Sequence, residues 1–142
     1  AYTLSHLFKN QDQISFTEEF RNLAHDLTHP EDFPMKELNI QAELRDYQKK
    51  GIQWLQMLHH YGLGGILADD MGLGKTLQTI AFLSSQVQAD TSVLILAPSG
   101  LIYNWADEFQ KFAPDLDVAV VHGLKSHRGS ILAENHQIYV TS

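Results

Sequence analysis

A glycine-rich stretch at residues 64–79 constrains the fold of this 142-residue chain more than any other feature. It reads GGILADDMGLGKTLQT, in which apolar residues 66–68 run into a glycine turn and then into apolar residues at helical spacing. This order predicts a strand, a glycine loop and a helix. Glycines let the backbone turn tightly, so that amide groups and the positive end of a helix dipole converge on an anion. The stretch therefore predicts a phosphate-binding loop within an α/β fold.

The side chains of the loop suit a nucleotide that carries Mg²⁺. Lys75 would place an ammonium among the outer phosphates, and the Thr76 hydroxyl would coordinate the metal ion, so both are candidate catalytic residues. The general pattern G-x-x-x-x-G-K-[ST] asks for glycine at position 69, where this chain has Asp69. The stretch is thus either a family variant of the phosphate loop or a glycine-rich turn that opens an ordinary helix.

Composition limits the class of protein. With 44% hydrophobic and 19% charged residues the chain is expected to be globular, and its longest apolar run, residues 93–97, is too short for a membrane span. There is no cysteine, which fits a reducing cytoplasm. A formal net charge of −7 argues against broad binding to nucleic acid. The start, Ala-Tyr-Thr-Leu-Ser, favours a piece of a longer, non-secreted chain.

Residues 1–40 are expected to form a helical arm and a linker. A capping box from Ser15 to Glu18 predicts a helix that ends before Pro30. His25 and His29 have the spacing of metal ligands, but nothing completes such a site, which favours solvated histidines. One face of the predicted helix carries Phe16, Phe20, Leu23 and Leu27.

A second helix is predicted over residues 44–60, with Gly62 as its stop. It leads directly to the glycine loop. The Gln48 carboxamide offers a donor and an acceptor side by side, which matches the N6/N7 edge of adenine. Gln48 is therefore either an adenine-reading residue that selects ATP or an ordinary surface glutamine.

Three further apolar runs, 93–97, 118–121 and 138–141, predict strands, and 101–112 predicts a helix between the first two. Alternation of strands and helices indicates a parallel sheet, whose binding sites lie outside the carboxyl ends of the strands. The turn Pro98-Ser99-Gly100 falls there together with the glycine loop. His122 and His127 lie in a polar, glycine-punctuated stretch, and the simpler interpretation is that they are loop histidines.

Three segments together give the chain a family resemblance. Residues 44–55 (LRDYQKKGIQWL), 66–76 (ILADDMGLGKT) and 96–105 (LAPSGLIYNW) with Glu108 resemble the first motor lobe of the Swi/Snf-type, helicase-like ATPases of helicase superfamily two. In that family Asp-x-Met-Gly-x-Gly-Lys-Thr is the form of the phosphate loop, which accounts for Asp69. The resemblance covers about 38–142. It implies a RecA-like, three-layer αβα parallel sheet, incomplete in residues 41–142 and preceded by the arm at 1–40.

The resemblance also implies site residues. Gln48 looks like the adenine-reading glutamine, and Pro98, Ser99 and Asn104 look like contacts to the DNA backbone. His122-Gly123 and Thr141-Ser142 are similar to family positions as well. The residues implied to bind ATP and its Mg²⁺ are Arg45, Gln48, Asp69, Asp70, Met71, Gly72, Leu73, Gly74, Lys75, Thr76 and Leu77, with Thr76 as the metal ligand.

The family's motor needs an acidic Mg²⁺-binding motif after a later strand and arginines from a second lobe in cis. Neither is recognised in these 142 residues, and Asp107-Glu108 lies on a predicted helix instead. The chain alone is therefore expected to bind nucleotide without turning it over, and to reach double-stranded DNA through the full-length protein. The expected location is the cytoplasm, at the bacterial nucleoid, or the nucleus if eukaryotic.

Two other functions stay open. A P-loop kinase or ATPase for a small substrate explains the glycine loop, but gives no reason for residues 45–48 or 99–105. A non-catalytic module, in which the helical arm binds a partner protein, gives no reason for an intact Lys75 and Thr76.

Overall fold

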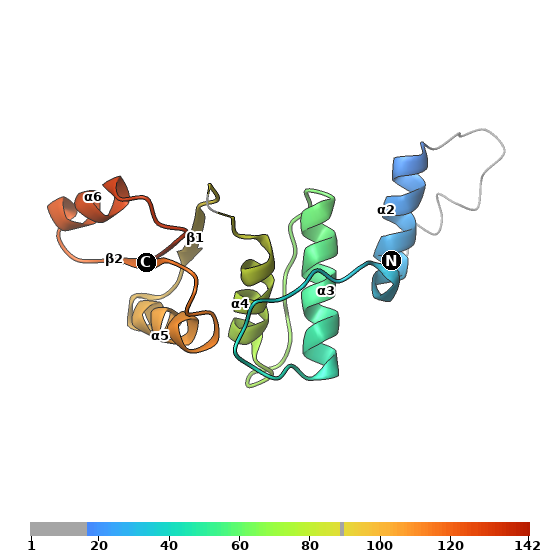
Figure 1. Ribbon diagram of the computed structural model, residues 1–142, viewed down its shortest axis with the longest axis horizontal. Helices are drawn as coiled ribbons and strands as arrows, with labels where there is room; N and C mark the ends of the chain where they lie inside the picture. Colours follow the sequence, from blue (N-terminus) through green and yellow to red (C-terminus); the bar gives the residue numbers. More distant parts are fainter. Residues whose placement is uncertain (1–16, 89) are drawn as a thin grey trace.

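The computed structural model describes residues 17–88 and 90–142. They form an α/β fold with a small parallel sheet (Figure 1). The elements in chain order are α2 (Glu18–Thr28), η1 (Pro30–Asp32), α3 (Asp46–His60), α4 (Lys75–Gln86), β1 (Val93–Leu96), η2 (Ser99–Leu101), α5 (Ile102–Phe112), β2 (Val118–Val121), α6 (Lys125–Ala133) and β3 (Ile138–Thr141).

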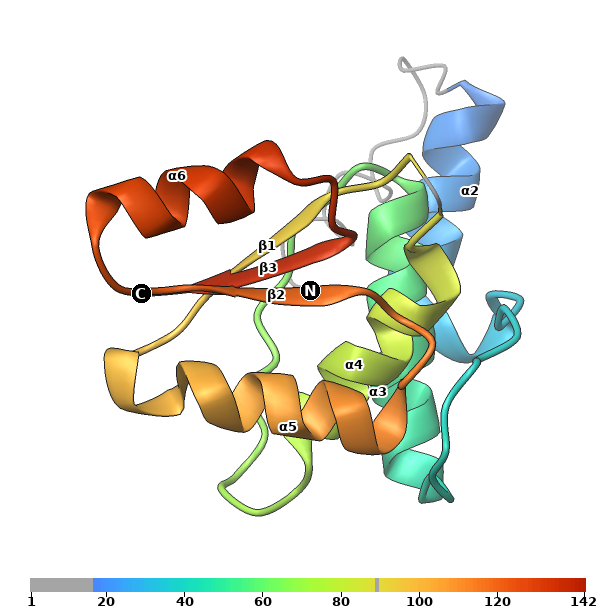
Figure 2. The same cartoon turned by 60° about the vertical axis from the view of Figure 1, so that its left-hand side comes forward.

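The sheet has the strand order β1-β3-β2, and both pairs are parallel. Ile138 at the start of β3 aligns with Val93 of β1 and with Val118 of β2. The connection through α5 therefore passes over β3, and the connection through α6 returns in the opposite direction. Since such crossovers keep one hand, the two helices must lie on opposite faces. Figure 2 shows α5 on one face of the sheet and α6 on the other.

The main core lies between α4, α5 and one face of the sheet. Alternate strand residues point into it, and the large Phe109 side chain at its centre is fully buried. This alternation is the ordinary period of a strand that has one covered face. The buried members are Ile80, Leu83, Ile95, Ala97, Ile102, Phe109, Ala113, Ile138 and Val140.

The opposite face of β1 is open. Leu94 is 61% exposed and Leu96 is 72% exposed, although both are large apolar residues. The expected strand at 66–68 does not form: residues 63–70 belong to no helix or strand, and Ile66 is 84% exposed. A strand exists only where a neighbour pairs with its main chain. In the described sheet β1 pairs with β3 alone, and no strand pairs with this segment.

Helices α3 and α4 pack against each other, and the segment that joins them runs back between the two helices in Figure 1. Two fully buried glutamines, Gln56 and Gln78, lie in this interface, and the carboxamides of both make hydrogen bonds. Gln56 donates to Ser85 Oγ at 2.8 Å and accepts from the Lys36 amide at 2.9 Å. These bonds satisfy a polar group that would otherwise be costly to bury.

The arm helix α2 is capped by Thr17, whose hydroxyl accepts from the Phe20 amide at 3.3 Å, and it ends before Pro30 as predicted. Ser15 and Phe16, at the start of the expected capping box, lie outside the described residues. The Tyr61 hydroxyl, just after α3, donates to Asp26 Oδ2 at 2.6 Å. This hydrogen bond, with some burial and the nearby negative charge, raises the pKa of Tyr61 to about 12.

The stretch at 122–135 contains the helix α6, where a polar loop was expected. None of the residues of α6 is buried, and Gly129 lies within it. Among residues 17–88 and 90–142, no helix has the length and apolar character needed to cross a membrane.

Candidate functional site

The glycine loop turns into α4 at Lys75. Gly72 and Gly74 have φ angles of 86° and 76°, the left-handed region that glycine adopts at little cost. The Gly74 carbonyl accepts from the Gln78 amide at 3.0 Å, the first hydrogen bond of the helix. Met71 at the tip of the loop is 97% exposed. The start of α4 thus follows an exposed loop, and the first amides of a helix have no partner within the helix, which is the arrangement that anion sites use.

The Lys75 side chain folds back over the loop. Its Nζ donates to the main-chain oxygens of Asp69 at 2.7 Å and Asp70 at 2.9 Å. The ammonium is thereby held above the turn that precedes the helix. Two carbonyl partners and a partly buried stem fix the position of this positive charge at the mouth of the loop.

Residues of α3 hold the other side of the loop. Gln48 is 6% exposed, and its Nε2 donates to the Leu73 oxygen at 3.2 Å while its Oε1 accepts from the Arg45 amide at 3.0 Å. The Tyr47 hydroxyl donates to the same Leu73 oxygen at 3.3 Å. A Cβ at Gly74 would lie 2.6 Å from Gln48 Nε2. Glycine at 74 is thus required twice, by its φ angle and by the close approach of α3.

Thr76, in the first turn of α4, lies next to α5. It lines a cavity of about 180 Å³ together with Leu101, Asn104, Trp105 and Glu108. The structure therefore brings the first turn of α4 next to Asn104, one of the residues expected to contact DNA. Pro98 and Ser99 are exposed at the carboxyl end of β1, and they lead into this cavity through η2.

The other expected residues differ in their exposure. Arg45, Asp70 and Met71 are exposed, and Asp69, Leu73 and Leu77 are half-buried. The His122 ring lies 6.1 Å from the Tyr103 ring in an edge arrangement, and His127 is exposed on α6. His25 and His29 stack on each other at 4.9 Å. Within the described part of the chain, no group of three or more His, Cys, Asp or Glu residues could hold a metal ion.

Sequence reasoning missed Gln78. It is 1% exposed, and its Nε2 donates to Asp69 Oδ2 at 2.9 Å. A signal exists, since Gln78 follows Lys75 by three residues and shares its face of the helix with Ala81 and Ser85. A polar side chain at an inward-facing position must find a partner, but the sequence does not say which one.

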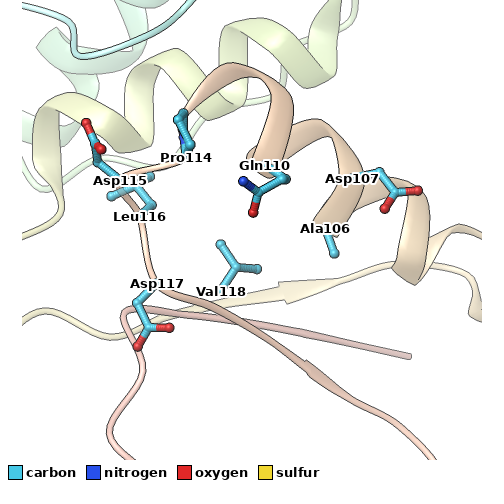
Figure 3. A pocket seen from close by; sticks show the side chains of 8 residues that line it. All are labelled: Ala106, Asp107, Gln110, Pro114, Asp115, Leu116, Asp117 and Val118. Atoms are coloured by element: carbon cyan, nitrogen blue, oxygen red, sulfur yellow. The ribbon is translucent and has the colours of Figure 1, made fainter.

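A larger cavity of about 580 Å³ lies between α5 and β2 (Figure 3). Asp107, Asp115 and Asp117 line it, and Gln110 and Val118 contribute to its walls. Val118 is the first residue of β2, so this cavity is near the amino end of the strand and away from the loop. Three carboxylates would repel phosphate, which leaves the loop at α4 as the candidate nucleotide site.

A parallel sheet with helices on both faces, and a glycine loop that opens a helix, define a RecA-like α/β protein. The chain belongs to the family of the SNF2-related domain, whose family model matches residues 47–142. The Sulfolobus solfataricus SWI2/SNF2 ATPase core in complex with dsDNA superposes with a TM-score of 0.66 at 43% identity, over 75% of this chain and 23% of that one.

Curated relatives agree with this assignment. YwqA of Bacillus subtilis (strain 168), provisionally named an ATP-dependent helicase/translocase, is 39% identical over 92% of this chain. The ISWI chromatin-remodeling complex ATPase ISW2 of Saccharomyces cerevisiae is 48% identical over 64% of it. The chain spans only 15% of the former and 8% of the latter.

Proposed function

We propose that this chain is the ATP-binding part of a DNA translocase that hydrolyses ATP with Mg²⁺. The observation that carries the proposal is the loop at 69–74, in which two left-handed glycines open α4 and the Lys75 ammonium lies over the turn. Membership of the SNF2-related family supports the same reaction, because relatives in it are named ATP-dependent helicases.

The residues of the loop fit a nucleotide. A Cβ at position 74 would fill the space next to Gln48, so the loop can keep its shape only with glycine there. Lys75 would bind the outer phosphates, the Thr76 hydroxyl would hold Mg²⁺, and amides of 70–76 would bond phosphate oxygens. Bound ATP supplies the phosphoryl group whose transfer to water releases the free energy for movement. Gln48, with Arg45 nearby, would read adenine.

We propose double-stranded DNA as the partner of the full-length protein. A solved relative, 43% identical, is a SWI2/SNF2 ATPase core in complex with dsDNA. Pro98, Ser99 and Asn104 would contact the backbone, since Pro98 and Ser99 follow the carboxyl end of β1 and Asn104 of α5 lines a cavity with Thr76 in the first turn of α4. With a net charge of −7 on the chain, such contacts must be local.

Catalysis would need groups beyond those assigned here. An acidic Mg²⁺-binding motif and arginines from a second lobe in cis would complete the site, so this chain alone would bind nucleotide without turnover. The arm α2 would be free to bind a protein partner. The protein would act where chromosomal DNA lies, at a nucleoid in the cytoplasm or in a nucleus.

Replacing Lys75 tests the proposal. In the full-length protein Lys75→Ala should reduce DNA-stimulated ATP hydrolysis by at least about 100-fold, the usual loss for one preorganised electrostatic group. In this chain alone, Mg²⁺ and ATP should raise the melting temperature, and Lys75→Ala should abolish that rise.

Lys111→Ala is the matched control, because Lys111 is exposed near the end of α5 and lies over the Phe112 ring. It should leave hydrolysis and the thermal shift unchanged. Hydrolysis that survives Lys75→Ala would remove the loop from the mechanism.

A further inference from the structure

We propose that Gln78 is a positioning residue for the phosphate loop, because it holds the Asp69 carboxylate against α4 and so fixes where the loop begins. This inference rests on the proposed function, since the loop matters only if it binds nucleotide. It adds a residue outside the glycine-lysine-threonine segment to the machinery of the site.

Two side chains on one face of α4 donate hydrogen bonds to residue 69. Gln78 Nε2 donates to the Asp69 carboxylate at 2.9 Å, and Lys75 Nζ donates to the Asp69 main-chain oxygen at 2.7 Å. Lys75 and Gln78 are three residues apart, so both side chains leave the first turns of the helix in the same direction. Together they lock the start of the loop relative to the helix whose amides would meet the phosphates.

The Gln78 carboxamide is itself confined. It is 1% exposed, and a Cβ on Gly51 of α3 would lie 2.1 Å from Gln78 Oε1 and 3.3 Å from its Cδ. A side chain at position 51 would therefore force the Gln78 carboxamide to move. The absence of a side chain there gives the carboxamide room to lie between α3 and Asp69.

Burial alone does not explain this arrangement. Gln56 is also 1% exposed in the same interface, yet it bonds Ser85 and the Lys36 amide, far along α4 from the loop. Gln56 therefore ties helices together, whereas Gln78 ties a helix to the loop. The acceptor of the Gln78 hydrogen bond is a carboxylate, and hydrogen bonds to a charged group are stronger than those between neutral groups such as the ones of Gln56.

The test compares variants of the full-length protein, with three measurements on each. Hydrogen exchange of amides 70–74 without nucleotide reports on the loop, titration with a fluorescent ATP analogue and Mg²⁺ reports on affinity, and the melting temperature reports on the fold. Gln78→Met should speed exchange in the loop and weaken nucleotide binding about tenfold, the effect of losing one hydrogen bond to a charged group. Gln78→Glu should weaken it further, because two carboxylates then face each other.

The decisive variant exchanges the two partners. Asp69→Asn combined with Gln78→Glu restores an amide-to-carboxylate hydrogen bond in the reverse direction and keeps the net charge. It should bring the rate of loop exchange and the nucleotide affinity back to within about threefold of the wild-type values. Its affinity should therefore be clearly higher than that of Gln78→Glu alone. Gln56→Met is the matched control, and it should lower the melting temperature without changing loop exchange or affinity.

The inference would be overturned if Gln78→Met left loop exchange unchanged, if Gln56→Met affected the loop equally, or if the exchanged pair recovered no better than Gln78→Glu. Failure of the wild type to bind nucleotide would instead reject the proposed function. Exchange measured without nucleotide would then decide the role of Gln78 by itself.

Discussion

For Gln48, the sequence predicts the hydrogen-bonding chemistry of the side chain but not the partners that it bonds. Its carboxamide suggested adenine, whereas in the structure it bonds the Leu73 oxygen and the Arg45 amide. A carboxamide has two donor hydrogens and two acceptor lone pairs, so one of each is left for a base. The chemistry of the residue was readable from the sequence. Its partner was not, because the fold brings together atoms 25 residues apart.

Gly51 gives a prediction at the same scale. Glycine-to-alanine in a helix usually stabilises by about 1 kcal/mol. Gly51→Ala should instead lower the free energy of unfolding by at least about 1 kcal/mol, since the new Cβ would lie 2.1 Å from Gln78 Oε1. Chemical denaturation followed by circular dichroism measures this change.

Gly129→Ala is the control for that experiment. Gly129 lies in α6 with no atom within 4 Å of an added Cβ, so the substitution should stabilise. The two Gly→Ala substitutions, both within helices, would then change the free energy of unfolding in opposite directions. Equal stabilisation by both variants would mean that Gln78 moves aside freely.

At the scale of elements, local patterns predicted most of the fold. The helix expected at 44–60 is observed at 46–60, and the strands at 118–121 and 138–141 have the predicted bounds. The sequence of each of these segments predicts its structure locally, through the spacing of its apolar residues and a nearby Gly or Pro that ends the element. The strand at 93–97 ends one residue early, within the usual uncertainty of such boundaries.

Two elements were not predicted correctly, for different physical reasons. The strand expected at 66–68 needs a partner that the described sheet does not offer, and pairing is not a local property. The helix α6 buries none of its residues, so its sequence has no apolar stripe from which a helix could be predicted. It lies in the crossover connection between β2 and β3.

The contact between Tyr61 and Asp26 predicts how α2 is held. Tyr61→Phe should lower the free energy of unfolding by about 1 kcal/mol at pH 8, because it removes this hydrogen bond. The folded pKa of Tyr61, about 12, is above its ordinary value of 10.0, so this stabilisation is complete below pH 10 and is lost as the pH rises towards 12. The difference between the wild type and Tyr61→Phe should therefore shrink over that interval.

Tyr103→Phe serves as the comparison, since Tyr103 is 57% exposed on α5. It should change stability little at any pH. Urea unfolding between pH 8 and 11.5 measures both variants, and a constant deficit for Tyr61→Phe across that range would contradict the role given to the Asp26 contact.

At the scale of the whole molecule, strand β1 is exposed on the side opposite the core. Leu94 and Leu96 are exposed on β1, which pairs with β3 alone among residues 17–88 and 90–142. Open apolar strand edges favour association between chains. This chain on its own should therefore self-associate at micromolar concentration, and Leu96→Lys should make it more monomeric in size-exclusion chromatography with light scattering.

Leu124→Lys provides the control, because Leu124 is 79% exposed but lies before α6 rather than on a strand. It adds the same charge and removes the same side chain. A monomeric wild type, or equal effects of the two lysines, would show that the open face of β1 does not drive association.

The anchors of the Lys75 ammonium have a consequence for how this protein tolerates change. Both acceptors, at residues 69 and 70, belong to the polypeptide backbone and not to side chains. Substitution of either aspartate removes no oxygen from that pair. The placement of the charge therefore depends on the path of the backbone, so a substitution at residue 70 need not release it, whereas residue 69 must also keep the contact of its carboxylate with Gln78.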